Sequence, residues 1–231
     1  MTATGSAPVI RASGIVKYFT EPVRFQVLQG ISLEVRRGEF VSIVGKSGCG
    51  KSTLLYVLST MDTDYEGTLE IHGETLTGKP QNFLSHFRNE HIGFVFQFHY
   101  LLPEFTVLGN LMVPAMKLGR YSKSEISDRA YEKLELMGIG DQALKPAKNL
   151  SGGQQQRAAI ARALINDPTL IIGDEPTGNL DSHNATAVFE ILSDLAKNNG
   201  QTIVVVTHDI EFAARTDRRI EMSDGKIVGA A

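Results

Sequence analysis

The sequence is organised around one stretch, Gly45-Lys46-Ser47-Gly48-Cys49-Gly50-Lys51-Ser52-Thr53. It fits the pattern G-x-x-x-x-G-K-[S/T], whose backbone N–H groups cradle the phosphates of a nucleotide. An apolar run at 40–44 precedes the stretch, and another at 54–58 follows it. A buried strand, a glycine-rich turn and a helix N-terminus in that order predict a phosphate-binding loop, or P-loop. A glycine turn with a purely structural purpose is the alternative.

Within this loop each residue type has a chemical task. The three glycines supply backbone freedom and let the chain approach a phosphate closely. Lys51 would neutralise charge on the β- and γ-phosphates, and the Ser52 hydroxyl would reach Mg²⁺. All of residues 45–53 are therefore predicted to contact the nucleotide or its metal ion.

The composition limits the possible functions. Of the 231 residues, 42% are hydrophobic and 21% charged, which is ordinary for a globular protein. The net charge of −3 and the lack of a basic stripe argue against a nucleic-acid partner. A single cysteine excludes an internal disulfide and suits a reducing compartment. No signal peptide is expected, and no apolar run approaches the roughly 20 residues that span a bilayer. Action at a membrane would therefore go through a partner.

Three residues stand at the ends of predicted strands, and one of them, His208, lies at the end where an α/β sheet binds its ligands. Tyr18 ends the first strand and could stack on an adenine ring. Gln97 follows the strand predicted over 92–96 and could bind Mg²⁺ or a water. His208 follows the strand predicted over 201–207 and could contact a terminal phosphate. Taken singly, each of the three is also compatible with an ordinary structural or surface role.

Two acids, Asp174 and Glu175, follow a buried strand predicted over 169–173. Carboxylates in this position are costly unless they bind a cation or take part in chemistry. Nucleotide hydrolysis needs a Mg²⁺ ligand and a group that orients the attacking water. We assign the first task to Asp174 and the second to Glu175, with a solvated turn as the alternative.

Residues 98–160 have the pattern of a helical insertion in an α/β core. A capping box at 122–125 predicts the start of one helix, and Pro114 is expected to break or kink another. The irregular apolar segment 98–105 is a candidate groove for a helix of a membrane partner, or else part of the core of the insertion.

A second phosphate-attracting helix start lies at Ser151-Gly152-Gly153-Gln154, ahead of an alanine-rich helix. The insertion separates it from the P-loop, so one chain need not bring the two together. A two-fold homodimer, in which the segment 151–153 of each chain covers the P-loop of the other, solves this problem. ATP binding would close such a dimer and hydrolysis would loosen it.

Taken in order, GKSGCGKST, Gln97, LSGGQQQR, LIIGDEP, the Asp181 loop and His208 resemble the ATP-binding subunit of an ABC transporter, over about residues 9–229. The resemblance implies an α/β fold with a P-loop NTPase (RecA-like) core and an antiparallel β subdomain, residues 1–97 and 161–231. It implies an inserted α-helical subdomain at residues 98–160. ATP and Mg²⁺ are the implied cofactors.

The resemblance also implies a role for each candidate residue. Glu175, His208 and Gln97 would be catalytic, and Ser52, Gln97 and Asp174 would bind the metal ion. Tyr18 would stack on adenine, Asp181 would contact the dimer partner, and Ser151, Gly152, Gly153 and Gln154 would act on the nucleotide of the partner. Two residues depart from the family pattern: Lys46 is either a second cation near the phosphates or points to solvent, and Gly173 is smaller than usual.

A finer match is carried by HFRNEHIGFVFQFHYLLPEFT and GDEPTGNLD. These runs resemble the ABC ATPases that release lipoproteins, export macrolides or act in cell division, and the lipoprotein-releasing type most. That type implies integral membrane subunits as partners and a place at the cytoplasmic face of the bacterial inner membrane. Export and division remain alternatives. A DNA-acting ABC ATPase would need a long coiled coil before the LSGGQ run, and a kinase or GTPase has no use for that run.

Overall fold

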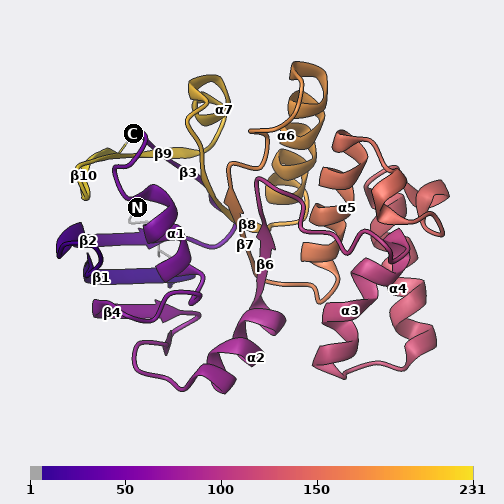
Figure 1. The fold of residues 1–231 in the computed structure, drawn as a ribbon, viewed down its shortest axis with the longest axis horizontal. Helices are drawn as coiled ribbons and strands as arrows, with labels where there is room; N and C mark the ends of the chain where they lie inside the picture. The colour runs from indigo at the N-terminus through magenta and orange to yellow at the C-terminus, as the bar shows by residue number, and fades with distance from the viewer. Residues whose placement is uncertain (1–6, 231) are drawn as a thin grey trace, which may run out of the picture. The chain divides into compact units, whose positions relative to one another are not determined.

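The computed structural model describes residues 7–230, so the tail expected at residues 1–8 lies mostly outside the described residues. The chain forms two compact units (Figure 1). The first unit consists of residues 1–84 and 193–231, and the second of residues 85–192.

One sheet of the first unit is antiparallel throughout, with the strand order β2-β1-β4-β5. In β1, buried residues such as Ile10 and Ala12 alternate with exposed ones, as expected for a sheet with one face on a core. Its strands are β1 (Ile10–Phe19), β2 (Phe25–Val35), β4 (Glu66–Ile71) and β5 (Glu74–Thr75). This sheet is the antiparallel part that the resemblance implies.

A second group of strands in the first unit is centred on the strand that leads into the P-loop. This strand, β3, runs parallel to β8 on one side and to β9 on the other, and β10 pairs with β9 in antiparallel fashion. All five residues of β8 are buried, which is typical of a parallel strand covered on both faces. The elements are β3 (Phe40–Gly45), α1 (Lys51–Leu58), β8 (Thr202–Val206), α7 (Ile210–Ala214), β9 (Arg218–Ser223) and β10 (Lys226–Ala230).

The second unit combines a parallel strand pair, β6 and β7, with a cluster of packed helices, α3, α4 and α5 (Figure 1). The bounds are β6 (Ile92–Val95), α3 (Val107–Leu118), α4 (Lys123–Leu136), α5 (Gly152–Leu164) and β7 (Leu170–Asp174), with 3-10 turns at Gly140–Gln142 and Ala147–Asn149. The boundary between the units falls within α2 (Gln81–His91) and within α6 (Ser182–Lys197).

Two local expectations in the helical cluster have different outcomes. The capping box of α4 is present, because Ser122 Oγ accepts from the N–H of Glu125 while the Glu125 carboxylate accepts from the N–H of Ser122. Pro114 was expected to break or kink its helix, and it does not break it, since α3 continues to Leu118. Leu111 and Ala115, on either side of the proline, are both buried, and this packing keeps α3 together despite the missing N–H.

None of the helices described within residues 7–230 is long and apolar enough to cross a membrane.

Candidate nucleotide-binding site

The P-loop forms as its glycines predict. A Cβ on Gly45 would lie 2.2 Å from the carbonyl oxygen of Met222, and a Cβ on Gly50 would lie 2.9 Å from that of Val27. Both glycines have positive φ angles, 156° and 100°, so side chains are excluded by space and by backbone conformation. Gly50 is the N-cap of α1, and the first N–H groups of a helix lack intrahelical acceptors. The loop therefore presents donors to an anion at the start of α1.

Lys51 is held beneath this loop. Its Nζ donates to the carbonyl oxygens of Gly45 and Lys46, at 2.8 and 3.0 Å, and the residue is only 8% exposed. These bonds fix the ammonium group against the backbone that would surround the phosphates. Lys46, Ser47 and Gly48 form an exposed tip, which favours the solvent-facing alternative for Lys46.

The remaining P-loop residues differ in exposure. Cys49 is buried, and its Sγ lies 2.8 Å from the point where a Cβ of Gly45 would be. Its carbonyl oxygen accepts from the N–H of Gly225 at 3.1 Å, which ties the loop to the β9–β10 turn. Ser52 is exposed in the first turn of α1, and Thr53 is half-buried.

His208 lies at the same sheet edge as the P-loop. The residue before it, Thr207, donates its N–H to the carbonyl oxygen of Ile43 at 3.1 Å, and Ile43 pairs with Val206 in the parallel register of β3 and β8. The exposed His208 thus follows a strand whose neighbour leads directly into the P-loop.

Strand β2 connects Tyr18 to the P-loop, because it pairs with β1 at Tyr18 and contacts the P-loop at Gly50. Tyr18 pairs with Gln26, and the next residue, Val27, has its carbonyl oxygen against Gly50. The ring of Tyr18 is half-buried and faces Arg24, whose guanidinium carbon is 4.2 Å from the ring centroid. An aromatic face that attracts a cation is also a face on which a base can stack.

The second unit brings Gln97 and Glu175 together. The ends of β6 and β7 are aligned, with Val95 opposite Gly173. The residues that follow Val95 and Gly173 therefore lie at one edge of the strand pair. A Cβ on Gly178 would lie 3.1 Å from Gln97 Nε2 and 3.4 Å from Glu175 Cβ. Gly178 therefore lies between these two side chains, and a larger residue there would force the Gln97 amide to shift by a few tenths of an ångström.

Asn179 is a site residue that the sequence analysis missed. Its Nδ2 donates to the backbone oxygen of Gln97 at 3.1 Å, and its Oδ1 accepts from Gln97 Nε2 at 3.4 Å. The only sequence signal was its place in the GNLD run after the acids.

Glu175 has a backbone φ of +48°, in the left-handed region. A non-glycine residue there costs of order 1 kcal/mol, and such outliers gather at functional sites. The carbonyl oxygen of Pro176 accepts from Gln156 Nε2 of α5 at 2.6 Å, which fixes the turn that carries the acid.

The start of α5 has the second capping box of the unit. Ser151 Oγ accepts from the N–H of Gln154, and Gln154 Oε1 accepts from the N–H of Ser151. The cap thus satisfies the N–H groups of Ser151 and Gln154, and those of Gly152 and Gly153 remain at the helix start, where anionic oxygens bind.

Asp181 caps α6. Its Oδ1 accepts from the backbone N–H of Asn184 and its Oδ2 from Asn184 Nδ2, both at 2.8 Å. The backbone bond, followed by the side-chain bond, lowers the pKa of the Asp181 carboxyl below its usual value. The role in dimer contact that the resemblance implies for Asp181 stays a prediction.

The predicted metal ligands fit Mg²⁺ by their chemistry. Ser52, Gln97 and Asp174 offer a hydroxyl, an amide oxygen and a carboxylate, which are the oxygen donors that Mg²⁺ prefers. Within residues 7–230 there is no group of three or more His, Cys, Asp or Glu that could hold a metal ion. This donor set fits an ion that is bound largely by phosphates and water, as in nucleotide sites.

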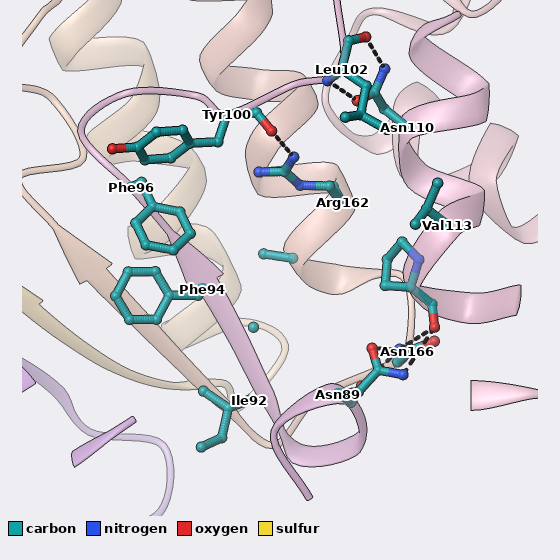
Figure 2. Close-up of a pocket in the computed structure, with 13 residues that line it drawn as sticks. Asn89, Ile92, Phe94, Phe96, Tyr100, Leu102, Asn110, Val113, Arg162 and Asn166 are labelled. Carbon is teal, nitrogen blue, oxygen red and sulfur yellow. Dashed lines mark hydrogen bonds between the residues drawn. The ribbon is translucent and has the colours of Figure 1, made fainter. Parts of the chain in front are cut away.

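A groove of about 410 Å³ lies in the second unit (Figure 2). Its walls are β6, α3 and α5 with the segment after Gln97, and it is lined by Asn89, Ile92, Gly93, Phe94, Phe96, Tyr100, Leu102, Asn110, Val113, Pro114, Arg162, Ala163 and Asn166. Arg162 of α5 donates to the backbone oxygens of Tyr100 and His99, at 2.6 and 2.8 Å. In the segment 98–105, Phe98, Tyr100, Leu102 and Phe105 are exposed.

Comparison with known proteins agrees with this geometry. The family described as ABC transporter matches residues 28–178. The chain is 50% identical over 220 residues to the lipoprotein-releasing system ATP-binding protein LolD of Bacteroides fragilis (strain YCH46), covering 95% of this chain and 100% of that protein. It is 48% identical over 223 residues to LolD of Aquifex aeolicus (strain VF5), covering 96% and 97%.

Solved structures give the same result for the fold. The structure titled "Dimeric Structure of MJ0796, a Bacterial ABC Transporter Cassette" superposes with a TM-score of 0.88 at 37% identity, covering 96% of this chain and 97% of that one. A second structure of that cassette, titled as a dimeric post-hydrolysis state bound to ADP and Pi, also has a TM-score of 0.88, at 36% identity. With a P-loop, two acids at the end of β7 and a glycine start of α5 on this fold, the chain belongs to the ABC transporter family, as an ATP-binding subunit that hydrolyses ATP.

Proposed function

We propose that this chain is the ATPase of a bacterial lipoprotein-releasing transporter, of the LolD type. The observation that carries the proposal is the identity of about 50% with LolD proteins over nearly the full length of both chains. The alternatives are a MacB-type export ATPase and an FtsE-like ATPase of cell division, because the motif GDEPTGNLD does not separate these types.

The chemistry is attack of a water on the γ-phosphate of ATP. Glu175 orients the water and takes its proton, and the His208 side chain binds the γ-phosphate from the end of β8. Lys51 and the N–H groups at the start of α1 stabilise charge on the phosphates, and adenine stacks on Tyr18. Ser52, Gln97 and Asp174 would hold Mg²⁺, and the bound ion would supply positive charge to neutralise the phosphates.

The working form is a homodimer closed by ATP. In it, the Ser151–Gln154 segment of one copy would cover the P-loop of the other, so that the free N–H groups of Gly152 and Gly153 reach the γ-phosphate. Asp181 would lie at the contact between the copies. The capping geometry of α5 and the dimeric title of the MJ0796 cassette support this arrangement.

The groove of Figure 2 is the proposed docking site for the membrane partner. Phenylalanines at 94 and 96 with exposed Tyr100 and Leu102 suit the apolar face of a short cytoplasmic helix. The partners would be integral membrane subunits of the LolC/LolE kind, and they would hold the ATPase at the cytoplasmic face of the inner membrane. The helical subdomain proposed for residues 98–160 supplies one wall of the groove, with Tyr100, Leu102, Asn110, Val113 and Pro114.

The test is purification of the tagged chain from its native membranes, followed by reconstitution. We expect lipoprotein-releasing membrane subunits to co-purify, and proteoliposomes of the complex to release a lipoprotein only with ATP. Recovery of division proteins, or of a macrolide exporter, without the lipoprotein subunits would contradict the proposal. A complex with Glu175→Gln is the control, since it binds ATP and should release no lipoprotein.

A further inference from the structure

Asn184 connects two functional segments of the second unit that are 30 residues apart in the chain. Asp181 accepts both the backbone N–H and the side-chain Nδ2 of Asn184, at 2.8 Å each. Both carboxylate oxygens of Asp181 are therefore bonded to Asn184. Because Nδ2 faces Asp181, the side-chain oxygen Oδ1 must point the other way.

Asn184 Oδ1 points at Gly153. A Cβ on Gly153 would lie 2.1 Å from this oxygen, 2.6 Å from Asn184 Cγ and 3.3 Å from Asn184 Cβ. Gly153 has no positive φ angle, so its backbone alone would accept a side chain. The absence of a side chain at 153 is explained by the space that Asn184 occupies.

Asn184 cannot move aside freely. A flexible side chain would yield to an added methyl group, but the two bonds to Asp181 fix the position of this one. Asn184 is also half-buried in the first turn of α6. A displacement of Asp181 must therefore move Asn184, and with it the contact to the start of α5.

We propose that Asn184 is a positioning residue, which fixes the positions of the Gly152 and Gly153 N–H groups relative to Asp181. The inference rests on the proposed function, in which both segments meet the second copy of the chain. Through Asn184, closure of the dimer at Asp181 aligns the phosphate-binding start of α5 in the same chain. This links the two ATP sites of a dimer, because the start of α5 and the P-loop of one chain serve different nucleotides.

The test is a double-mutant cycle on the full chain, with Gly153→Ala, Asn184→Ala and the two combined. We expect Gly153→Ala to lower kcat by about a hundred-fold, since a shift of an ångström in a binding group has effects of this size. We expect Asn184→Ala to lower kcat by about ten-fold and to reduce the Hill coefficient for ATP towards 1. In the double variant the space beside residue 153 is open, so its kcat should approach that of Asn184→Ala.

Thr186→Ala is the matched control. Thr186 is exposed on the same helix and its hydroxyl donates only to the backbone oxygen of Ser182, at 2.9 Å, so kcat and the Hill coefficient should not change. Binding of ATP to the P-loop, measured with a fluorescent analogue, should be unchanged in every variant.

The outcomes separate this inference from the proposed function. Losses in kcat that simply multiply in the double variant, or a Gly153→Ala variant as active as the wild type, would overturn the role of Asn184. An unaltered Hill coefficient in Asn184→Ala would overturn the link between the sites. A wild-type chain that hydrolyses ATP but releases no lipoprotein with its membrane partner would contradict the proposed function. The double-mutant cycle on kcat would still test the role of Asn184 in that case. Thermal melting of each variant identifies a loss of fold. If Gly153→Ala alone does not fold, recovery of folding and of kcat in the double variant decides whether Asn184 causes the clash.

Discussion

Gln97 and Asn179 hold each other through two hydrogen bonds, one between their side chains at 3.4 Å and one from Asn179 Nδ2 to the backbone oxygen of Gln97 at 3.1 Å. Gln97 follows β6 and Asn179 follows β7, so these bonds join the two segments that leave the parallel strands at the same edge. The position of the Gln97 amide is thus set by a residue that has no assigned chemistry of its own.

Replacing Asn179 with Ala should lower kcat about five-fold with little change in ATP affinity. The loss corresponds to about 1 kcal/mol, the usual worth of a neutral hydrogen bond. The nucleotide affinity should persist because the P-loop belongs to the other unit. Steady-state ATPase rates over a Mg²⁺ series would measure the effect, with Asn198→Ala as a control at an exposed position. A kcat equal to that of the wild type would show that Gln97 does not depend on Asn179.

Glu175→Gln should lose hydrolysis and keep ATP binding. General-base catalysis contributes about 10²- to 10⁴-fold, so kcat should fall within that range. Glutamine has the same shape as glutamate, and the site should remain intact. Size-exclusion chromatography with MgATP should show a stable dimer, while Glu221→Gln, an exposed acid on β9, should behave as the wild type. Hydrolysis at the normal rate would mean that another group orients the water.

The two P-loop lysines should differ sharply. Lys51→Ala should raise the Kd for ATP by about a hundred-fold, since charge-assisted hydrogen bonds to phosphates are each worth about 1.5–3 kcal/mol. Lys46→Ala should change it by no more than about three-fold, because Lys46 is exposed and its field is screened by salt. Titration with a fluorescent ATP analogue at two salt concentrations measures both. Equal losses would contradict the assignment of Lys46 to solvent.

Asp167 gives the second unit a pH-dependent contribution to stability. Burial raises the pKa of its carboxyl, but ion pairs with Lys133, at 2.6 Å, and Arg129 outweigh this and hold the pKa below its usual value. The contribution is therefore present above the unfolded pKa of about 3.9 and is lost as the pH falls through the lower folded-state pKa. Because the carboxylate is 55% exposed, we expect no more than about 1 kcal/mol.

Asp167→Asn is the suitable variant, because residue 167 has a φ of +49° and asparagine tolerates that region. At pH 7 the melting temperature should fall by about 2–3 °C. Urea unfolding from pH 7 down to pH 3 should show the difference from the wild type shrinking below about pH 4. A difference that stays constant with pH would rule out the ionised carboxylate as its source.

The sequence predicted those features that short-range chemistry decides. The strands predicted over 92–96, 169–173 and 201–207 and the capping box at Ser122 and Glu125 follow from apolar spacing and local hydrogen bonds, and the structure has β6, β7, β8 and the cap at these places. The short helix α7 and the two-residue strand β5 were missed, because five and two residues carry too little periodicity. Pro114 does not break α3, because burial of its neighbours outweighs the local preference of a proline.

The contacts that position the candidate site residues could not be predicted from the sequence. Gln97 and Asn179 are 82 residues apart, and Asn184 meets Gly153 across two helices. Nothing in the local pattern of either pair indicates the other member. Motifs therefore indicate the candidate reactive groups, and the structure shows which residues contact them.

The left-handed backbone at Glu175 implies a conflict between folding and activity at one position. Glycine would occupy that conformation without strain, and glutamate is there at a cost of about 1 kcal/mol. A Glu175→Gly protein should thus be the inactive one that survives heating longest. A screen that selects this ATPase for thermal stability alone would favour loss of the carboxylate proposed to orient the water, so such a screen must include turnover as a second criterion.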